Sequence, residues 1–199
     1  RRPRVLKKAW QAMLRSGGAI RRSRHASKKG LELRKIKKAV SISERPAEVE
    51  DRAVPGHWEG DLIAGSNNSF IATLVERHSR FVMLAKVANK DTLSVTTALI
   101  KQARKLPKEL YKSLTWDRGS EMAGHQNFTI ATNIDVYFCD PQAPWQRGSN
   151  ENTNRLLRQY FPKSTDISGF SQATLGAVAR QLNDRPRPTY LYKQPPETC

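Results

Sequence analysis

HWEGDLIA, residues 57–64, opens a run of three β-rich segments, which continues with FIATLVE at 70–76 and RFVMLAKVA at 80–88. A polar tripeptide at 77–79 separates the second segment from the third and is typical of a turn. Short runs rich in β-branched and aromatic residues predict strands, and their short connections predict antiparallel neighbours. The three segments therefore predict an antiparallel meander.

The rest of the chain alternates between helical and extended patterns. Strands that alternate with helices pair in parallel through crossover connections. The expected fold class is therefore α/β, with a mixed five-stranded sheet flanked by helices, and this element order is that of RNase H-like folds. Helices are expected at 91–105, 121–133, 149–161 and 171–184, and short strands at 113–117 and 134–138.

Positive charge is concentrated at the start of the chain. Residues 1–46 hold 16 of the 35 Lys and Arg residues but only two of the 18 acids, whereas residues 47–199 are nearly balanced. The sequence therefore predicts a basic DNA-binding arm or linker at 1–46 and a folded domain at 47–199. Within the arm, residues 3–15 are expected to form a short basic helix.

The density of Lys and Arg in the arm disfavours a compact structure unless a polyanion is bound, because like charges repel. Nucleic acid is the expected partner, since neutralised phosphates release their counterions. The pairs Arg21-Arg22 and Lys28-Lys29 are candidate contacts. A solubilising tail and an anionic membrane surface are the alternatives, and the few large apolar residues of the arm disfavour the membrane.

Composition excludes several classes of protein. No apolar run approaches the roughly 18 residues of a membrane-spanning helix, and the basic start lacks the apolar core of a secretory signal. Cys139 and Cys199 are too few for a disulfide framework or a cysteine-rich zinc module. A cytoplasmic location without membrane contact is expected.

Three acidic residues stand out by their positions. Asp61 lies within the first predicted strand, Asp117 ends the fourth, and Glu151 falls in the first turn of the helix after the long loop. Mg²⁺ prefers oxygen ligands, and two such ions about 4 Å apart activate an attacking oxygen and stabilise a leaving one. Taken singly, each acid is better explained as a cap, a turn residue or a surface charge. Only the joint pattern indicates a metal site.

Several longer motifs surround these acids, and together they closely resemble the insertion sequence thirty family of bacterial transposases. The resemblance covers about four-fifths of the chain, from about residue 40 to the end. The segment at 144–154 is the longest and most specific. The motifs are ERPAEVED at 44–51, GHWEGD at 56–61, LVER at 74–77, DRGSE at 117–121, PWQRGSNENTN at 144–154, LLRQYFPK at 156–163 and NDRPR at 183–187.

The resemblance implies a DDE transposase (integrase catalytic core) with an RNase H-like fold, in which Asp61, Asp117 and Glu151 match the catalytic, metal-binding acids. Such an enzyme uses Mg²⁺ or Mn²⁺ to cut element ends in double-stranded DNA with water. It then joins the 3′-OH ends to target DNA, as a homo-oligomer in a synaptic complex. Two features depart from the family pattern: Arg118 stands where related cores often have Asn, and the N-terminal helix-turn-helix region is not visible.

Two further polar residues share a strand with the first acid. His57 and Glu59 fall on the same face as Asp61, where they either support the metal ligands or are ordinary polar strand residues. Trp58 alternates to the other face and is expected in the core.

DNA contacts are expected from the helix at 149–161 and the loop before it. Helical spacing gathers polar residues on the face of the third acid, where a guanidinium would hold a phosphate beside the metal. A solvated charged face is the alternative. Trp145 either stacks on DNA or packs under the loop. The candidates are Arg147, Asn150, Asn154, Arg155 and Arg158.

Three functions are compatible with the residues alone. The first is an enzyme that cleaves DNA and transfers strands, and the second is an inactive or truncated fragment that only binds DNA. The third is an RNase H-like nuclease of RNA–DNA hybrids, which shares the metal chemistry. The intact set of three acids favours an enzyme, and the motifs favour a transposase.

Overall fold

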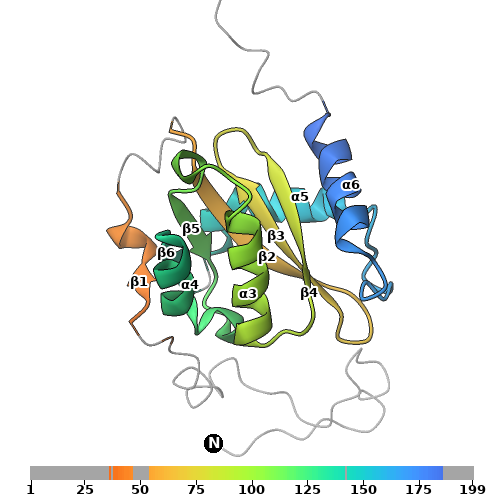
Figure 1. Ribbon diagram of the computed structural model, residues 1–199, viewed down its shortest axis with the longest axis horizontal. Helices are drawn as coiled ribbons and strands as arrows, with labels where there is room; N and C mark the ends of the chain where they lie inside the picture. The colour runs from red at the N-terminus through yellow and green to blue at the C-terminus, as the bar shows by residue number, and fades with distance from the viewer. Residues whose placement is uncertain (1–35, 37, 47–53, 142, 186–199) are drawn as a thin grey trace, which may run out of the picture. The chain divides into compact units, whose positions relative to one another are not determined.

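A six-stranded mixed sheet organises the folded domain (Figure 1). The computed structural model describes residues 36, 38–46, 54–141 and 143–185. Across the sheet the strands follow the order β1-β6-β5-β2-β3-β4. Their bounds are Val40–Ser41 for β1, His57–Ala64 for β2, Phe70–Glu76 for β3, Val82–Val87 for β4, Ser113–Trp116 for β5 and Asp135–Phe138 for β6.

The three β-rich segments form the predicted meander, because β3 pairs antiparallel with both β2 and β4. On the other side of β2, strands β5 and β6 add in parallel. The expected mixed sheet is therefore confirmed. The four main helices lie close to their predicted positions: α3 spans Thr92–Ala103, α4 His125–Thr132, α5 Gly148–Leu157 and α6 Gln172–Asn183.

The sheet has one strand more than the five expected. The additional strand β1 pairs in parallel with β6. It continues into a 3-10 turn, Ile42–Glu44, which buries Ile42 and is closed by a capping box between Ser41 and Glu44. The division of the chain at residue 46 stays a prediction. Of the residues expected in the arm, however, Val40 and Ser41 belong to the sheet and 42–44 form the turn that follows.

Two apolar cores cover the two faces of the sheet. One contains Leu99 of α3 and Phe128 of α4. These two helices lie in front of the strands in Figure 1. It also contains Trp58, which is 2% exposed and so lies in the core as predicted. The other core contains Leu157 of α5 and Leu175 of α6. Helices therefore flank the sheet on both sides.

Two side-chain amides of α6 cover the edge of β4. Asn183 accepts the N–H of Val82 at 2.8 Å and donates to the carbonyl of the same residue at 3.0 Å. Gln172 accepts the N–H of Lys86 and donates to the carbonyl of Leu84, both at 2.8 Å. Unpaired strand edges invite pairing with other chains, and these amides take the place of a further strand.

The predicted helix at 3–15 and the candidate contacts Arg21, Arg22, Lys28 and Lys29 lie outside the described residues. Among the residues that are described, no helix is long and apolar enough to cross a bilayer.

Gly60 makes room for the indole of Trp116, so we expect Gly60→Ala to destabilise the domain. A methyl group on residue 60 of β2 would overlap the ring of Trp116, which is fully buried on the neighbouring strand β5. Overpacking of this kind typically costs about 1–3 kcal/mol. Urea denaturation should therefore show a lower midpoint with an unchanged slope.

Gly169→Ala is the matched control, because a methyl group there meets no atom within 4 Å. Equal losses of stability in both variants would refute the packing argument.

Candidate active site

Neighbouring strands bring Asp61 and Asp117 to one cation. Asp61 lies in β2, and Asp117 directly follows β5, the parallel neighbour of β2. The guanidinium of Arg147 bridges the two carboxylates: Nη1 lies 3.4 Å from Oδ1 of Asp61, and Nη2 lies 3.6 Å from Oδ2 of Asp117. The first two predicted acids therefore share a site, with a positive charge between them.

Arg147 ends the 3-10 turn η5, Pro144–Arg147, directly before α5. Its side chain is 16% exposed, and Nη1 also donates to the carbonyl of Gly60 at 3.2 Å. Its Nε is buried and has no hydrogen-bond partner among the described residues. Desolvation alone would lower the pKa of Arg147, but Asp61 and Asp117 outweigh it and raise that pKa, so the guanidinium stays charged.

Asp61 has a second neighbour, which comes from α5. Nδ2 of Asn154 donates to Oδ2 of Asp61 at 3.1 Å, and the N–H of Leu62 donates to Oδ1 at 2.8 Å. Burial raises the pKa of Asp61, Arg147 opposes the rise, and Asp117 adds to it. The carboxylate is therefore short of compensating charge even with a guanidinium beside it.

A tight turn sets the position of Asp117. Its Oδ1 accepts the N–H of Gly119 at 2.9 Å, and its side chain is 40% exposed. Arg118, which stands where related cores often have Asn, donates from Nε to the carbonyl of Cys139 at 3.0 Å. Arg147 is therefore the cation that pairs with Asp117 in this structure.

A buried carboxylate fixes the start of α5 over the sheet. Glu59 is fully buried: its Oε2 accepts the backbone N–H of Asn150 at 3.0 Å, and its Oε1 lies 3.4 Å from Nε of Arg77. The side-chain oxygen of Asn150 accepts a hydrogen bond from Thr73 at 3.0 Å. Glu59 thus holds the helix that carries the third predicted acid.

Glu151, the third acid, is exposed in the first turn of α5. It precedes Asn154 by three residues, so it lies on the same flank of the helix as the amide that contacts Asp61. Within the described part of the chain, no three His, Cys, Asp or Glu side chains gather closely enough to hold a metal ion. The structure therefore brings together two of the three predicted acids and places the third on the adjoining helix.

The chemistry of these groups fits a divalent cation. Asp61 and Asp117 are partly exposed carboxylates that already flank a positive charge, and carboxylate oxygens are the ligands that Mg²⁺ and similar hard ions prefer. The side-chain oxygen of Asn154 is buried without a hydrogen-bond partner among the described residues. Beside Asp61, this oxygen is a further potential ligand for a metal ion.

His57 fits the second of its two expected roles, an ordinary polar strand residue, whereas Asn150 is less exposed than a DNA contact requires. Nδ1 of His57 bonds to Ser113 at 2.8 Å, at the start of β5, whereas Asp117 follows the end of that strand. Burial lowers the pKa of His57, which keeps the ring neutral near pH 7. Asn150 is fully buried, and this burial argues against a DNA contact by its side chain.

Other candidates for DNA contact lie closer to solvent. Arg155 is exposed on α5. Arg158 is half-buried and donates from Nη1 to the carbonyl of Ala64 at 2.9 Å. Trp145, in the turn before α5, is 73% exposed and is therefore not packed under the loop.

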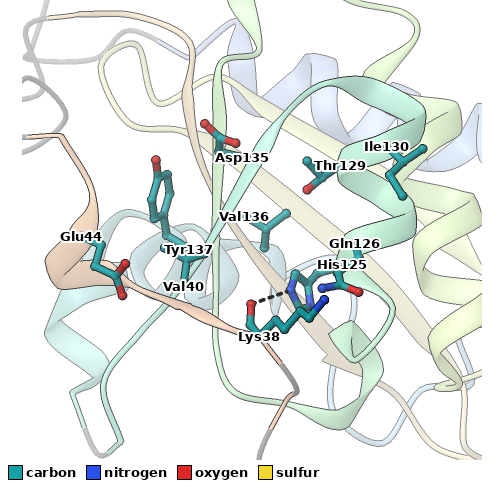
Figure 2. A pocket seen from close by; sticks show the side chains of 10 residues that line it. All are labelled: Lys38, Val40, Glu44, His125, Gln126, Thr129, Ile130, Asp135, Val136 and Tyr137. Carbon is teal, nitrogen blue, oxygen red and sulfur yellow. Dashed lines mark hydrogen bonds between the residues drawn. The ribbon is translucent and has the colours of Figure 1, made fainter.

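A groove at the β1 edge of the sheet is separate from these residues (Figure 2). It is lined by β1, β6 and α4, with Val40, Ile130 and Tyr137 among its walls. The ring of His125 lies in hydrogen-bond contact with the carbonyl of Lys38 there, at 3.3 Å. Of the predicted site residues that the structure describes, none lines this groove.

Comparison with known proteins identifies relatives of the whole described domain. Residues 51–144 match the integrase core domain family. Transposase InsI for insertion sequence element IS30A of Escherichia coli strain K12 is 50% identical over 185 residues, which cover 92% of this chain and 48% of that protein. The transposase for insertion sequence element IS1086 of Cupriavidus metallidurans is 49% identical over 175 residues, 87% of this chain and 50% of that protein. The chain thus spans about half the length of these relatives.

Solved structures agree with the architecture. The catalytic core domain of BIV integrase superposes with a TM-score of 0.50 at 18% identity, over 66% of this chain and 86% of that one. A chain of the simian T-cell lymphotropic virus intasome gives the same TM-score at 20% identity, over 67% of this chain and 56% of that one. At such identities the likeness concerns the fold, which is RNase H-like as expected. The sequence matches add that the chain is similar to transposases of the IS30 family and that its residues 51–144 match the integrase core domain.

Proposed function

We propose that this chain is the catalytic core of a DNA transposase, which cleaves the ends of an insertion element and transfers the strands to target DNA. The observation that carries the proposal is the meeting of Asp61 and Asp117 at one cation, with Glu151 on the helix that contacts Asp61. The presence of all three acids favours an active core over an inactive fragment that only binds DNA.

We assign Asp61 and Asp117 as ligands of Mg²⁺ or Mn²⁺, with Glu151 as the third acid. When bound, such an ion supplies Lewis acidity and lowers the pKa of an attacking water. The protein's own part is positioning: β2 and β5 fix the two aspartates, and Glu59 fixes the start of α5. Asn154 orients the carboxylate of Asp61 through its hydrogen bond. Phosphoryl transfer depends mainly on such positioning and on electrostatic stabilisation.

Double-stranded DNA is the proposed partner. Trp145 lies in the turn before α5, Arg155 on α5 and Arg158 directly after it, and each has surface open to solvent. The basic residues of the arm are the proposed sequence-independent phosphate contacts. We further propose that the protein acts as a homo-oligomer, because both ends of an element must be held together for transfer, and that it works in the cytoplasm.

Replacing both aspartates should abolish stabilisation by divalent metal. An ion that binds only the folded chain stabilises it by about 2.7 kcal/mol when its free concentration is about 100 times its Kd. Wild-type protein should therefore melt at a higher Tm as Mn²⁺ replaces EDTA, whereas Asp61→Asn with Asp117→Asn should not. The control with the same charge change is Asp135→Asn with Asp184→Asn, at two exposed acids. An undiminished shift in the Asp61 and Asp117 variant would place the ions elsewhere.

Glu151→Gln should stop strand transfer and leave DNA binding intact. The substitution keeps the shape and one oxygen but removes the charge, and losing one preorganised catalytic group typically costs about 10²–10³ in rate. Strand transfer of a labelled element-end duplex and fluorescence anisotropy measure the two properties. Glu109→Gln, at an exposed acid in the 3-10 turn Lys108–Leu110, is the matched control. Wild-type transfer rates in both variants would remove Glu151 from the site.

Neutralising the arm should flatten the salt dependence of DNA binding. If four arm cations contact phosphates, replacing them with Gln should reduce the slope of log K against log salt by about 3–4. An unchanged slope would show that the arm is not the main phosphate contact. The residues to replace are Arg21, Arg22, Lys28 and Lys29. The control replaces four exposed cations at or after the end of α3: Lys101, Arg104, Lys105 and Lys108.

A further inference from the structure

Arg147 faces the same two carboxylates that we assign to the metal. Its Nη atoms lie 3.4 and 3.6 Å from oxygens of Asp61 and Asp117. Mg²⁺ binds carboxylate oxygens at about 2.0–2.1 Å, so an ion ligated by both aspartates needs the oxygens that the guanidinium now faces. Like charges at one carboxylate pair also repel. Arg147 and a divalent ion therefore compete for Asp61 and Asp117.

The present partners of Arg147 leave it incompletely satisfied. Besides the two carboxylates, the guanidinium donates to the carbonyl of Gly60. Its Nε is buried with no hydrogen-bond partner among the described residues. A phosphate accepts two parallel N–H bonds from a guanidinium and carries a full negative charge. A DNA phosphate beside the site is thus a competent alternative partner for Arg147.

The turn that carries Arg147 is lightly held. Trp145 in the same turn is 73% exposed, and no side chain caps the start of the turn. Gly148, which follows, has no atom within 4 Å of the position that a Cβ would take. Among the described residues, the side chain of Gln146 bonds nearby in the chain, to the backbone N–H and the carboxylate of Asp140. Arg147 can therefore be re-aimed without disturbing either apolar core.

We propose that Arg147 is the resting counterion of Asp61 and Asp117, and that a DNA phosphate draws it away, so that the aspartates bind metal much more tightly once DNA is present. This inference rests on the proposed function, because it takes the two aspartates as metal ligands. Arg147 is then a positioning residue that couples two binding events. Without DNA, it partly compensates the charge of the carboxylate pair and keeps the metal-dependent chemistry switched off.

Thermodynamic linkage makes the coupling measurable from either side. If DNA raises the affinity for metal by some factor, metal raises the affinity for DNA by the same factor, and couplings of about 5–150-fold are typical. Without the guanidinium, Asp61 and Asp117 are open to metal at all times. The metal affinity in the absence of DNA should then rise, and the coupling factor should fall towards one.

Titration calorimetry with Mn²⁺ on the full chain, with and without a short duplex of arbitrary sequence, tests the proposal. Sequence does not matter for the probe, because phosphate contacts are independent of it. For Arg147→Gln we expect a Mn²⁺ affinity without DNA about tenfold or more above wild type, and almost no further gain with DNA. Arg147→Lys keeps the charge but loses the forked guanidinium that spans two carboxylates. Its Mn²⁺ affinity without DNA, and its gain in affinity with DNA, should therefore lie between those of wild type and Arg147→Gln.

Arg118→Gln is the matched control, because it removes an equal charge next to Asp117 from a side chain that bonds to the carbonyl of Cys139. Its metal affinity and its coupling should stay near wild type, and circular dichroism melts check that each variant folds. Equal Mn²⁺ affinities and equal coupling in wild type, Arg147→Gln and Arg147→Lys would overturn the inference and leave the proposed function standing. Absence of Mn²⁺ binding in every protein, with and without DNA, would overturn both.

Discussion

The rest of the site depends on the contacts that the buried carboxylate of Glu59 makes with Asn150 and Arg77. In the central strand β2, Glu59 is 0% exposed, accepts the N–H of Asn150 and lies 3.4 Å from Arg77. Removing one partner of a buried ion pair costs about 3–5 kcal/mol, so β2, the turn after β3 and the start of α5 are held as one unit. Because α5 begins over Glu59, its next turn delivers Asn154 to Asp61.

The strand patterns predicted most of the sheet, because β2, β3 and β4 have six to eight residues each and show their character locally. The shorter β5 and β6 were predicted from brief extended patterns that alternate with the helices. β1 has two residues in a basic stretch and exists through its pairing with β6. Two residues are too few to show the alternation of apolar and polar side chains that identifies a strand in a sequence, so β1 could not be predicted.

The site was predictable where a regular element fixes a side chain and not where a loop does. Asp61 and Asp117 follow from strand positions. Helical spacing grouped Asn150 with Arg155 but could not tell which flank of α5 meets the sheet, and Asn150 is fully buried whereas Arg155 is exposed. The pairing of Arg147 with both aspartates depends on the conformation of η5, which has no periodic pattern. The sequence offered one indication of this pairing, which is that Arg147 directly precedes the helix that carries Glu151.

Two neighbouring, partly buried carboxylates are stabilised by a positive charge, whether a guanidinium or a metal ion supplies it. Burial raises the pKa of Asp61, and the neighbouring charge of Asp117 adds to the rise, so ionising Asp61 is unfavourable until a cation lowers the cost. At rest the chain supplies that cation itself, through Arg147. In a loaded site the same guanidinium would repel the incoming ions, unless its charge moved to a phosphate. An arginine here is therefore compatible with metal-dependent phosphoryl transfer only if it changes partners, and the substrate supplies the group to which it can turn.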